Sequence, residues 1–137
     1  MSIIVQMNTT ASLRLPYSVE NRAQGKMLTL EEDRVVYESK SFWFRQRREL
    51  RYEAIAEVIV QMVQGPPQSL GVPAHPVLHV NENKGGHHAA NQAPIVFNLL
   101  FTNACQRAQL LSILKHKATK AVFSELANQY AVSEPVE

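Results

Sequence analysis

Short stretches of apolar and polar residues separated by turn-forming residues recur in the first half of the chain. Residues 26–30 and 34–39 are each predicted to be a strand, and the acidic triplet 31–33 between them predicts a tight turn. Together they predict a β-hairpin. Residues 11–19 can hold an earlier strand. The pattern therefore indicates an antiparallel sheet.

A third strand is predicted directly after Lys40. Side chains of a strand point alternately to its two faces, so Phe42 and Phe44 are expected to share the face toward the core. The opposite face is assigned to Trp43, Arg45 and Arg47. We expect the Trp43 ring to be partly buried rather than open to solvent.

The middle of the chain predicts two further strands separated by long loops. Residues 49–61 contain repeated apolar residues, but the regular spacing of these residues breaks near 54–56. A short turn before a new strand explains this phase slip. Residues 64–76 hold several prolines and glycines, and proline donates no ladder hydrogen bond, so a loop is predicted there. Residues 77–80 resume as a strand, and 81–92 form a second loop rich in Asn, Gly and His.

The last part of the chain changes from period two to helical spacing. Residues 95–101 form the clearest strand, with one apolar face made by Ile95, Phe97, Leu99 and Phe101. Asn103 is a good N-cap for an amphipathic helix that is expected to reach about Asn128, some seven turns. The predicted fold class is α+β: a sandwich or partly open barrel of about seven antiparallel strands, capped by one C-terminal helix.

Length and composition suit one domain. The chain has 137 residues, of which 45% are hydrophobic, enough for a single core. We expect a flexible N-terminus over 1–10, the domain over 11–128 and a flexible tail over 129–137. Cys105 is the only cysteine, which excludes an intramolecular disulfide and favours a reducing compartment. No apolar run is long enough to span a bilayer.

Residues 40–51 are the most charged stretch of the chain. They combine three consecutive aromatic residues with four arginines, one lysine and a single carboxylate, although the whole chain has a net charge of only +2. Arginine beside aromatic surface is typical of a binding face, since guanidinium pairs with carboxylate or phosphate. An acidic partner is therefore predicted. The candidate partner-binding residues are Lys40, Trp43, Arg45, Arg47, Arg48 and Arg51; a solvated strand face whose arginine stems cover apolar surface is the alternative.

The sequence gives little support for catalysis, metal binding or nucleic-acid binding. There is no Gly-rich phosphate loop and no Gly-x-Ser-x-Gly motif, so we expect no catalytic residues and no enzyme activity. The adjacent His87 and His88 lack cysteine or acidic co-ligands at a known spacing, so no metal and no cofactor are expected. Nucleic acid is a weaker alternative partner, because the net charge is low for binding that depends on counterion release.

The order of elements resembles the pleckstrin-homology (PH) and GRAM-type pattern over about residues 11–128. Within that superfamily, three segments are similar to the N-terminal PH-like domain of the large core subunit of the transcription and repair factor TFIIH. They are residues 25–36, Val77-Leu78-His79, and 97–103. The proline-rich loop and the long 81–92 segment depart from that family.

The TFIIH resemblance implies a noncatalytic module in the nucleus that docks acidic segments of other proteins within a larger complex. The docking surface of that family corresponds here to a basic region of the chain and not to a shared residue motif. The alternative is a GRAM or PH adaptor at the cytoplasmic face of a membrane that binds phosphoinositides. Lys26, Lys40 and Arg45 could converge on a headgroup, but the acidic turn 31–33 would repel it if that turn lay at the same end.

Overall fold

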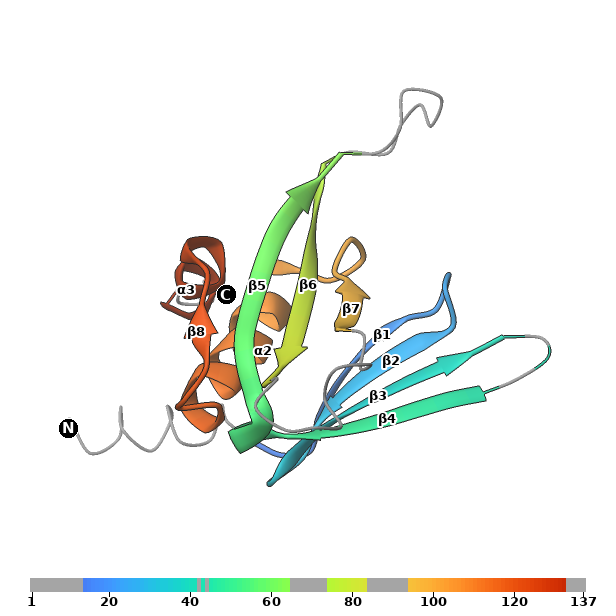
Figure 1. Ribbon diagram of the computed structural model, residues 1–137. Helices are drawn as coiled ribbons and strands as arrows, with labels where there is room; N and C mark the ends of the chain where they lie inside the picture. The colour runs from blue at the N-terminus through green and yellow to red at the C-terminus, as the bar shows by residue number, and fades with distance from the viewer. Residues whose placement is uncertain (1–13, 42, 44, 65–73, 84–93, 133–137) are drawn as a thin grey trace.

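A computed structural model describes residues 14–41, 43, 45–64, 74–83 and 94–132, and the statements below concern these residues (Figure 1). They form two four-stranded sheets, with two α-helices at the C-terminal end. The elements are β1 (Tyr17–Asn21), β2 (Lys26–Leu30), β3 (Arg34–Lys40), β4 (Arg45–Arg51), the 3₁₀-helix η1 (Tyr52–Ala54), β5 (Ile55–Val63), β6 (His75–Glu82), β7 (Ile95–Asn98), α2 (Ala104–Lys117), β8 (Val122–Phe123) and α3 (Glu125–Val132).

The first sheet is an antiparallel meander with the strand order β1-β2-β3-β4. The β1–β2 turn and the β3–β4 loop therefore lie at one end of this sheet, on the right in Figure 1. We call it the loop end. At this end Gly25 has a positive φ of 67°, and its carbonyl accepts a hydrogen bond from the Lys40 backbone N–H at 2.8 Å. The β2–β3 turn, residues 31–33, lies at the opposite end.

The second sheet has the strand order β7-β6-β5-β8. The short 3₁₀-helix η1 carries the chain from the first sheet into β5, and the β5–β6 pairing contains a bulge between Ile55 and Glu57. The turn predicted from the phase slip near residues 54–56 is confirmed. Strand β8 pairs with β5 in parallel, at Glu57 and Val58, and so occupies part of that edge.

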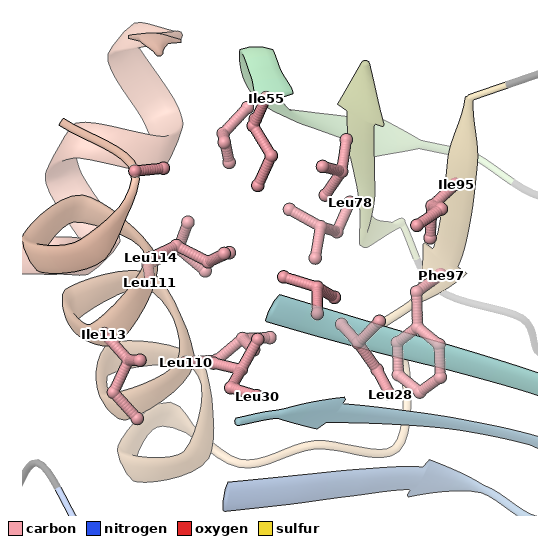
Figure 2. Packing of buried hydrophobic residues seen from close by; sticks show 14 of the residues in the cluster. Leu28, Leu30, Ile55, Leu78, Ile95, Phe97, Leu110, Leu111, Ile113 and Leu114 are labelled. Carbon is pink, nitrogen blue, oxygen red and sulfur yellow. The ribbon is translucent and has the colours of Figure 1, made fainter. Parts of the chain in front are cut away.

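The core lies between the two sheets and α2, and Figure 2 shows side chains from all three layers meeting there. Leu28 and Leu30 come from the first sheet, and Leu78 and Phe97 come from the second. Leu111 is among the helix residues that close the core. Each of these side chains is fully buried. Removing this apolar surface from water is the main force that holds the two sheets together.

Asn103 is the N-cap of α2, as the sequence predicted. Its side-chain oxygen accepts from the Gln106 backbone N–H at 2.7 Å, and the Gln106 side chain accepts from the Asn103 N–H at 2.9 Å. This reciprocal pair is a capping box. Lys115, His116 and Lys117 in the last turn suit the negative end of the helix dipole.

The predicted single helix of seven turns is wrong. Helix α2 ends at Lys117, the chain then pairs with β5 as β8, and a second helix, α3, begins at Glu125. Ser124 explains the restart, because its hydroxyl accepts hydrogen bonds from the backbone N–H groups of Val60 and Ala127. One serine therefore both fixes the chain to the β5 edge and caps the new helix.

Several strand boundaries also differ from prediction, including that of the first strand, which was predicted within 11–19 and spans Tyr17–Asn21. Strand β7 ends at Asn98, whose side chain accepts from the Leu100 N–H at 2.7 Å, so the chain turns and the Phe101 ring is not buried. Strand β6 begins at His75 and includes Pro76, within the stretch predicted to be a loop. Proline is tolerated there because it stands at the start of the strand.

The predicted α+β class, a sandwich with a C-terminal helical cap, is confirmed by the strand order, and its strands are antiparallel except for the parallel β5–β8 pair. Among the described strands none pairs across the two sheets, so they form a sandwich and not a closed barrel. No helix in the described ranges is both long and apolar enough to cross a membrane.

Candidate functional site

The basic residues of β4 are divided between the two faces of the first sheet. Arg45, Arg47, Glu49 and Arg51 alternate along the outer face, whereas Arg48 shares the inner face with the buried Leu50. The predicted common face of Arg45 and Arg47 agrees with this arrangement. Phe42 and Phe44, predicted to point inward, lie outside the described residues.

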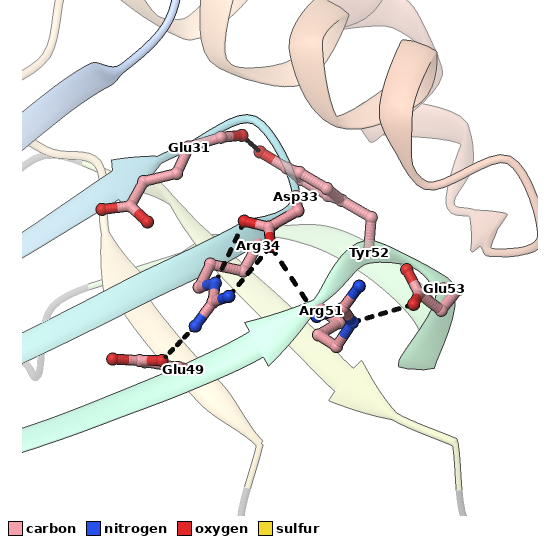
Figure 3. A network of polar contacts seen from close by, with 7 residues as sticks. All are labelled: Glu31, Asp33, Arg34, Glu49, Arg51, Tyr52 and Glu53. Carbon is pink, nitrogen blue, oxygen red and sulfur yellow. Dashed lines mark hydrogen bonds and ion pairs between the residues drawn. The ribbon is translucent and has the colours of Figure 1, made fainter.

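The outer face of the first sheet carries a chain of alternating charges, which we call the ionic network. Figure 3 shows the part of it made by Asp33, Arg34, Glu49, Arg51 and Glu53. Arg47 contacts Glu49 at 3.0 Å and Glu38 at 3.4 Å. Glu49 also binds Arg34 at 2.6 Å, and Arg34 binds Asp33 at 2.9 Å. Arg51 continues the network to Asp33 at 3.7 Å and to Glu53 at 2.9 Å.

The ionic network is close to neutral, because three arginines face four carboxylates. Its members are Arg34, Arg47 and Arg51, with Asp33, Glu38, Glu49 and Glu53. Val36 lies on the same face and is nevertheless 2% exposed. Its cross-strand neighbours are Thr29 and Glu49, so long side chains around it cover apolar surface as well as pairing charge.

The hydrogen bonds of the ionic network shift the pKa values of its carboxyl groups. The hydrogen bond from Arg34 lowers the pKa of Glu49 below its ordinary value, and Arg47 adds to the effect. The Arg34 hydrogen bond likewise lowers the pKa of Asp33, and Arg51 lowers the pKa of Glu53. All three carboxylates therefore remain ionised to lower pH than isolated side chains do.

Arg48 links the two sheets. Its guanidinium donates to the Glu82 carboxylate of β6 at 3.1 Å, and the two side chains are only 16% and 27% exposed. A ligand at the outer face of β4 has no direct route to this inward-pointing group. Arg48, one of the predicted site residues, is thus paired within the chain with Glu82.

Lys40, Trp43 and Arg45 occupy the loop end of the first sheet. Lys40 and Arg45 are cross-strand partners and both are exposed. Among the described residues, neither of their side chains forms an ion pair. Trp43 is 90% exposed, so the prediction of a partly buried ring is wrong. The reason is its place: it stands in the loop between β3 and β4, not within the strand.

The acidic turn 31–33 lies at the far end from Lys40 and Arg45. Tyr52 holds this turn through a hydrogen bond from its hydroxyl to the Glu31 carbonyl at 2.6 Å, and Lys117 of α2 contacts Glu32 at 3.3 Å. The acidic turn and the basic residues Lys40 and Arg45 are therefore separated by the length of the sheet. The anticipated repulsion of an anion at the loop end does not arise from this turn.

Lys26 also lies at the loop end but on the other face from Lys40. It is the cross-strand partner of Ser39, the neighbour of Lys40 in sequence, and neighbouring residues of a strand point to opposite sides. A hollow of about 260 Å³ at this end includes both lysines in its lining. Lys26 and Lys40 therefore meet at this hollow from opposite faces of the sheet, whereas Arg45 is not among the residues that line it.

A second, larger groove of about 750 Å³ borders the outer edge of β1. Ser18 and Glu20 of β1 line it together with Met27, Phe101 and Gln106. Phe101 is 67% exposed. The period-two pattern of 95–101 predicted that this ring shares one apolar strand face with Ile95, Phe97 and Leu99, which are buried. The Asn98 side chain, a common turn former, was the available signal that the strand stops earlier.

Within the described ranges, no three His, Cys, Asp or Glu side chains are grouped so that they could hold a metal ion.

The chain was compared with known protein families, curated proteins and solved structures. No model of a known protein family matches the chain. No curated protein matches its sequence. A crystal structure of a pleckstrin homology domain from Shewanella amazonensis SB2B is similar, with 13% sequence identity and a TM-score of 0.47. The similarity covers 69% of this chain and 75% of that one.

Proposed function

We propose that this domain is a noncatalytic docking module that binds acidic segments of other proteins at the loop end of the first sheet. The binding residues are Lys40 and Arg45, which supply charge, and Trp43, which supplies an exposed aromatic surface. The observation that carries the proposal is the contrast between these cations and the arginines of the ionic network. Lys40 and Arg45 have no carboxylate partner among the described residues, whereas Arg34, Arg47 and Arg51 each have one or more.

The contrast matters because a ligand must compete with partners that are already present. An incoming carboxylate at Arg47 would have to displace Glu38 or Glu49, so little free energy is gained there. At Lys40 and Arg45 the same carboxylate displaces no ion-pair partner among the described residues. Attraction at exposed sites is screened by salt, so binding weakens as ionic strength rises.

Trp43 provides the second component of the site. A tryptophan at a loop tip offers a large surface that loses little conformational entropy on binding, and tryptophan is enriched among residues that dominate binding energy. Its exposure of 90% leaves most of the ring available to a partner. The preferred ligand is therefore an acidic segment that contains at least one aromatic or apolar residue.

The resemblance to the TFIIH large subunit suggests a particular setting for this activity. In that setting the partners are acidic segments of transcription and repair proteins, the domain belongs to a larger complex, and the location is the nucleus. This proposal rests on residues 25–36, Val77-Leu78-His79 and 97–103 and on the basic region, and tagging the full-length protein in cells tests it. Localisation at a membrane, without nuclear signal, would reject it.

Binding of a labelled acidic peptide tests the docking site directly. The double variant Lys40→Glu with Arg45→Glu is expected to reduce affinity for a peptide with four consecutive aspartates at least tenfold. A matched control is Lys115→Glu with Lys120→Glu, which makes the same change in net charge on exposed residues of the helical layer. Equal loss in both double variants would show that only net charge matters and would reject the site.

Phosphoinositide binding is the second candidate, and one observation favours it. The acidic turn 31–33 is at the opposite end from Lys40 and Arg45, so it does not face a headgroup bound there. Basic residues beside a tryptophan also suit the interface of an anionic membrane. Sedimentation with phosphatidylcholine vesicles, with and without phosphatidylinositol 4,5-bisphosphate, distinguishes the two. Strong pelleting that requires the inositol lipid would favour the membrane adaptor over the peptide-docking module.

A further inference from the structure

The outer edge of β1 is available for strand pairing. Sheet order places β1 at the end of the first sheet, where it pairs with β2 alone among the described strands. Alternate residues of an edge strand direct their N–H and C=O groups away from the sheet. Three consecutive residues of β1, 18–20, line the 750 Å³ groove, so this groove runs along the edge of the strand.

The lining of the groove includes an exposed apolar side chain. Phe101 lines it together with Met27 of β2 and the residues of β1. Phe101 follows the turn that Asn98 and Thr102 stabilise, with the Thr102 hydroxyl donating to the Leu99 carbonyl at 2.6 Å. The ring is thus held beside the N-terminus of α2 by a fixed turn, and not by burial.

The groove is continuous with the basic loop end. Glu20, Arg22 and Met27 line both this groove and the smaller hollow that includes Lys26 and Lys40. The two carboxylates in the hollow already have partners, since Glu20 contacts Arg22 at 3.5 Å and Glu38 contacts Arg47. The lysines have no such partner among the described residues, which leaves an excess of positive charge at this end of the path.

We propose that the partner segment adds as a strand to the edge of β1, with its acidic residues at the loop end and an apolar side chain against Phe101. The inference rests on the proposed function and extends it by naming the path of the ligand and its second anchor. β1 has five residues and spans about 17 Å, so the segment between the acidic cluster and the apolar anchor has about five residues. Main-chain hydrogen bonds supply affinity and the two ends supply specificity.

Synthetic peptides that carry both features test this path. Each has four aspartates at one end, a five-residue stretch of Thr, Val and Ser, and a phenylalanine at the other end. Both chain orders are made, and a matched set carries serine in place of phenylalanine. The better phenylalanine peptide is expected to bind the whole chain about tenfold more tightly than its serine counterpart. Equal affinities for the two sets would overturn the proposal.

Two protein variants locate the effect. Phe101→Ala is expected to abolish the tenfold advantage without changing the affinity for the serine peptides. Val122→Ala is the control, because Val122 is 68% exposed and lies on β8 at the edge of the other sheet. Thermal unfolding establishes that both variants are folded. An advantage that survives Phe101→Ala would place the apolar anchor elsewhere and reject the groove.

Amide hydrogen exchange tests strand addition separately from side-chain contact. Binding is expected to slow exchange at alternate amides of β1 within 18–20. Absence of protection there would contradict pairing at this edge, even if Phe101 proved to be an anchor. The failure of the docking site itself has a different signature, namely that the Lys40→Glu and Arg45→Glu double variant still binds the serine peptides normally.

Discussion

Arg48 of β4 donates a hydrogen bond to Glu82 of β6 and so joins the two sheets through one ion pair at 3.1 Å. Both side chains are largely buried. An arginine in the most basic stretch of the chain thus serves the fold. Of the predicted site cations, Lys40 and Arg45 at the loop end are the ones without an ion pair among the described residues.

Removing the Arg48 charge should destabilise the domain. Arg48→Met keeps the apolar stem but leaves the Glu82 carboxylate without its partner, and the expected cost is about 1–2 kcal/mol in the free energy of unfolding. Urea unfolding of Arg48→Met, Glu82→Gln and the double variant measures the coupling between the two groups. Additive effects of the two changes would mean that the pair contributes nothing to stability.

The ionic network should make stability depend on pH in the acid range. The pKa of Glu49 is lowered by Arg34 and Arg47, so the unfolded chain takes up a proton at a higher pH than the native state does. The stabilisation is complete above the ordinary pKa of 4.5 and is lost as pH falls through the lowered value. Glu49→Gln should flatten the curve of unfolding free energy against pH below 4.5. An unchanged slope would contradict the network.

The hydroxyl of Tyr52 should contribute to the acidic turn. Tyr52→Phe retains the buried ring and removes the 2.6 Å hydrogen bond to the Glu31 carbonyl, at an expected cost of about 1 kcal/mol. Burial raises the pKa of the Tyr52 hydroxyl, so the native state keeps a proton that the unfolded chain loses in alkali. Wild-type stability should therefore decline above about pH 10, more steeply than in Tyr52→Phe. Parallel curves for the two proteins would refute this role.

Gly25 should be required at the loop end. A Cβ at this position would lie 2.5 Å from the Lys40 carbonyl oxygen, and the backbone has a φ of +67°. Gly25→Ala is expected to cost about 1–2 kcal/mol and to weaken acidic-peptide binding, because Lys40 must move. Ala23→Ser in the same turn is the control. Unaltered stability and affinity in Gly25→Ala would show that the turn can relax without disturbing Lys40.

Local sequence signals accounted for much of the fold. The hairpin over 26–39, the slip that became η1 and the Asn103 cap all depend on residues close in sequence, and each was predicted. The division of the C-terminal helix was not, because β8 forms through pairing with β5, more than sixty residues earlier. Apolar spacing across residues 118–124 continued the helical pattern, whereas strand pairing decided the outcome.

The candidate site was less predictable, since the charges that matter are cross-strand neighbours. Glu38 faces Arg47, and Arg34 faces Arg51, only once the β3–β4 register is fixed. The alternation of Arg47, Glu49 and Arg51 at a spacing of two was visible in the sequence and indicates an internally neutralised face. Lys40, Trp43 and Arg45 form the part of the predicted site that belongs neither to this network nor to the Arg48–Glu82 pair.

Trp43 is the only tryptophan of the chain, so its fluorescence reports on the proposed site alone. The decisive measurement is its emission and acrylamide quenching as an acidic peptide without tryptophan is added at low salt. The account predicts emission at shorter wavelength and reduced quenching, both reversed by salt and absent in the Lys40→Glu and Arg45→Glu double variant. Saturable binding of the peptide with no change in Trp43 emission or quenching would contradict docking at the loop end.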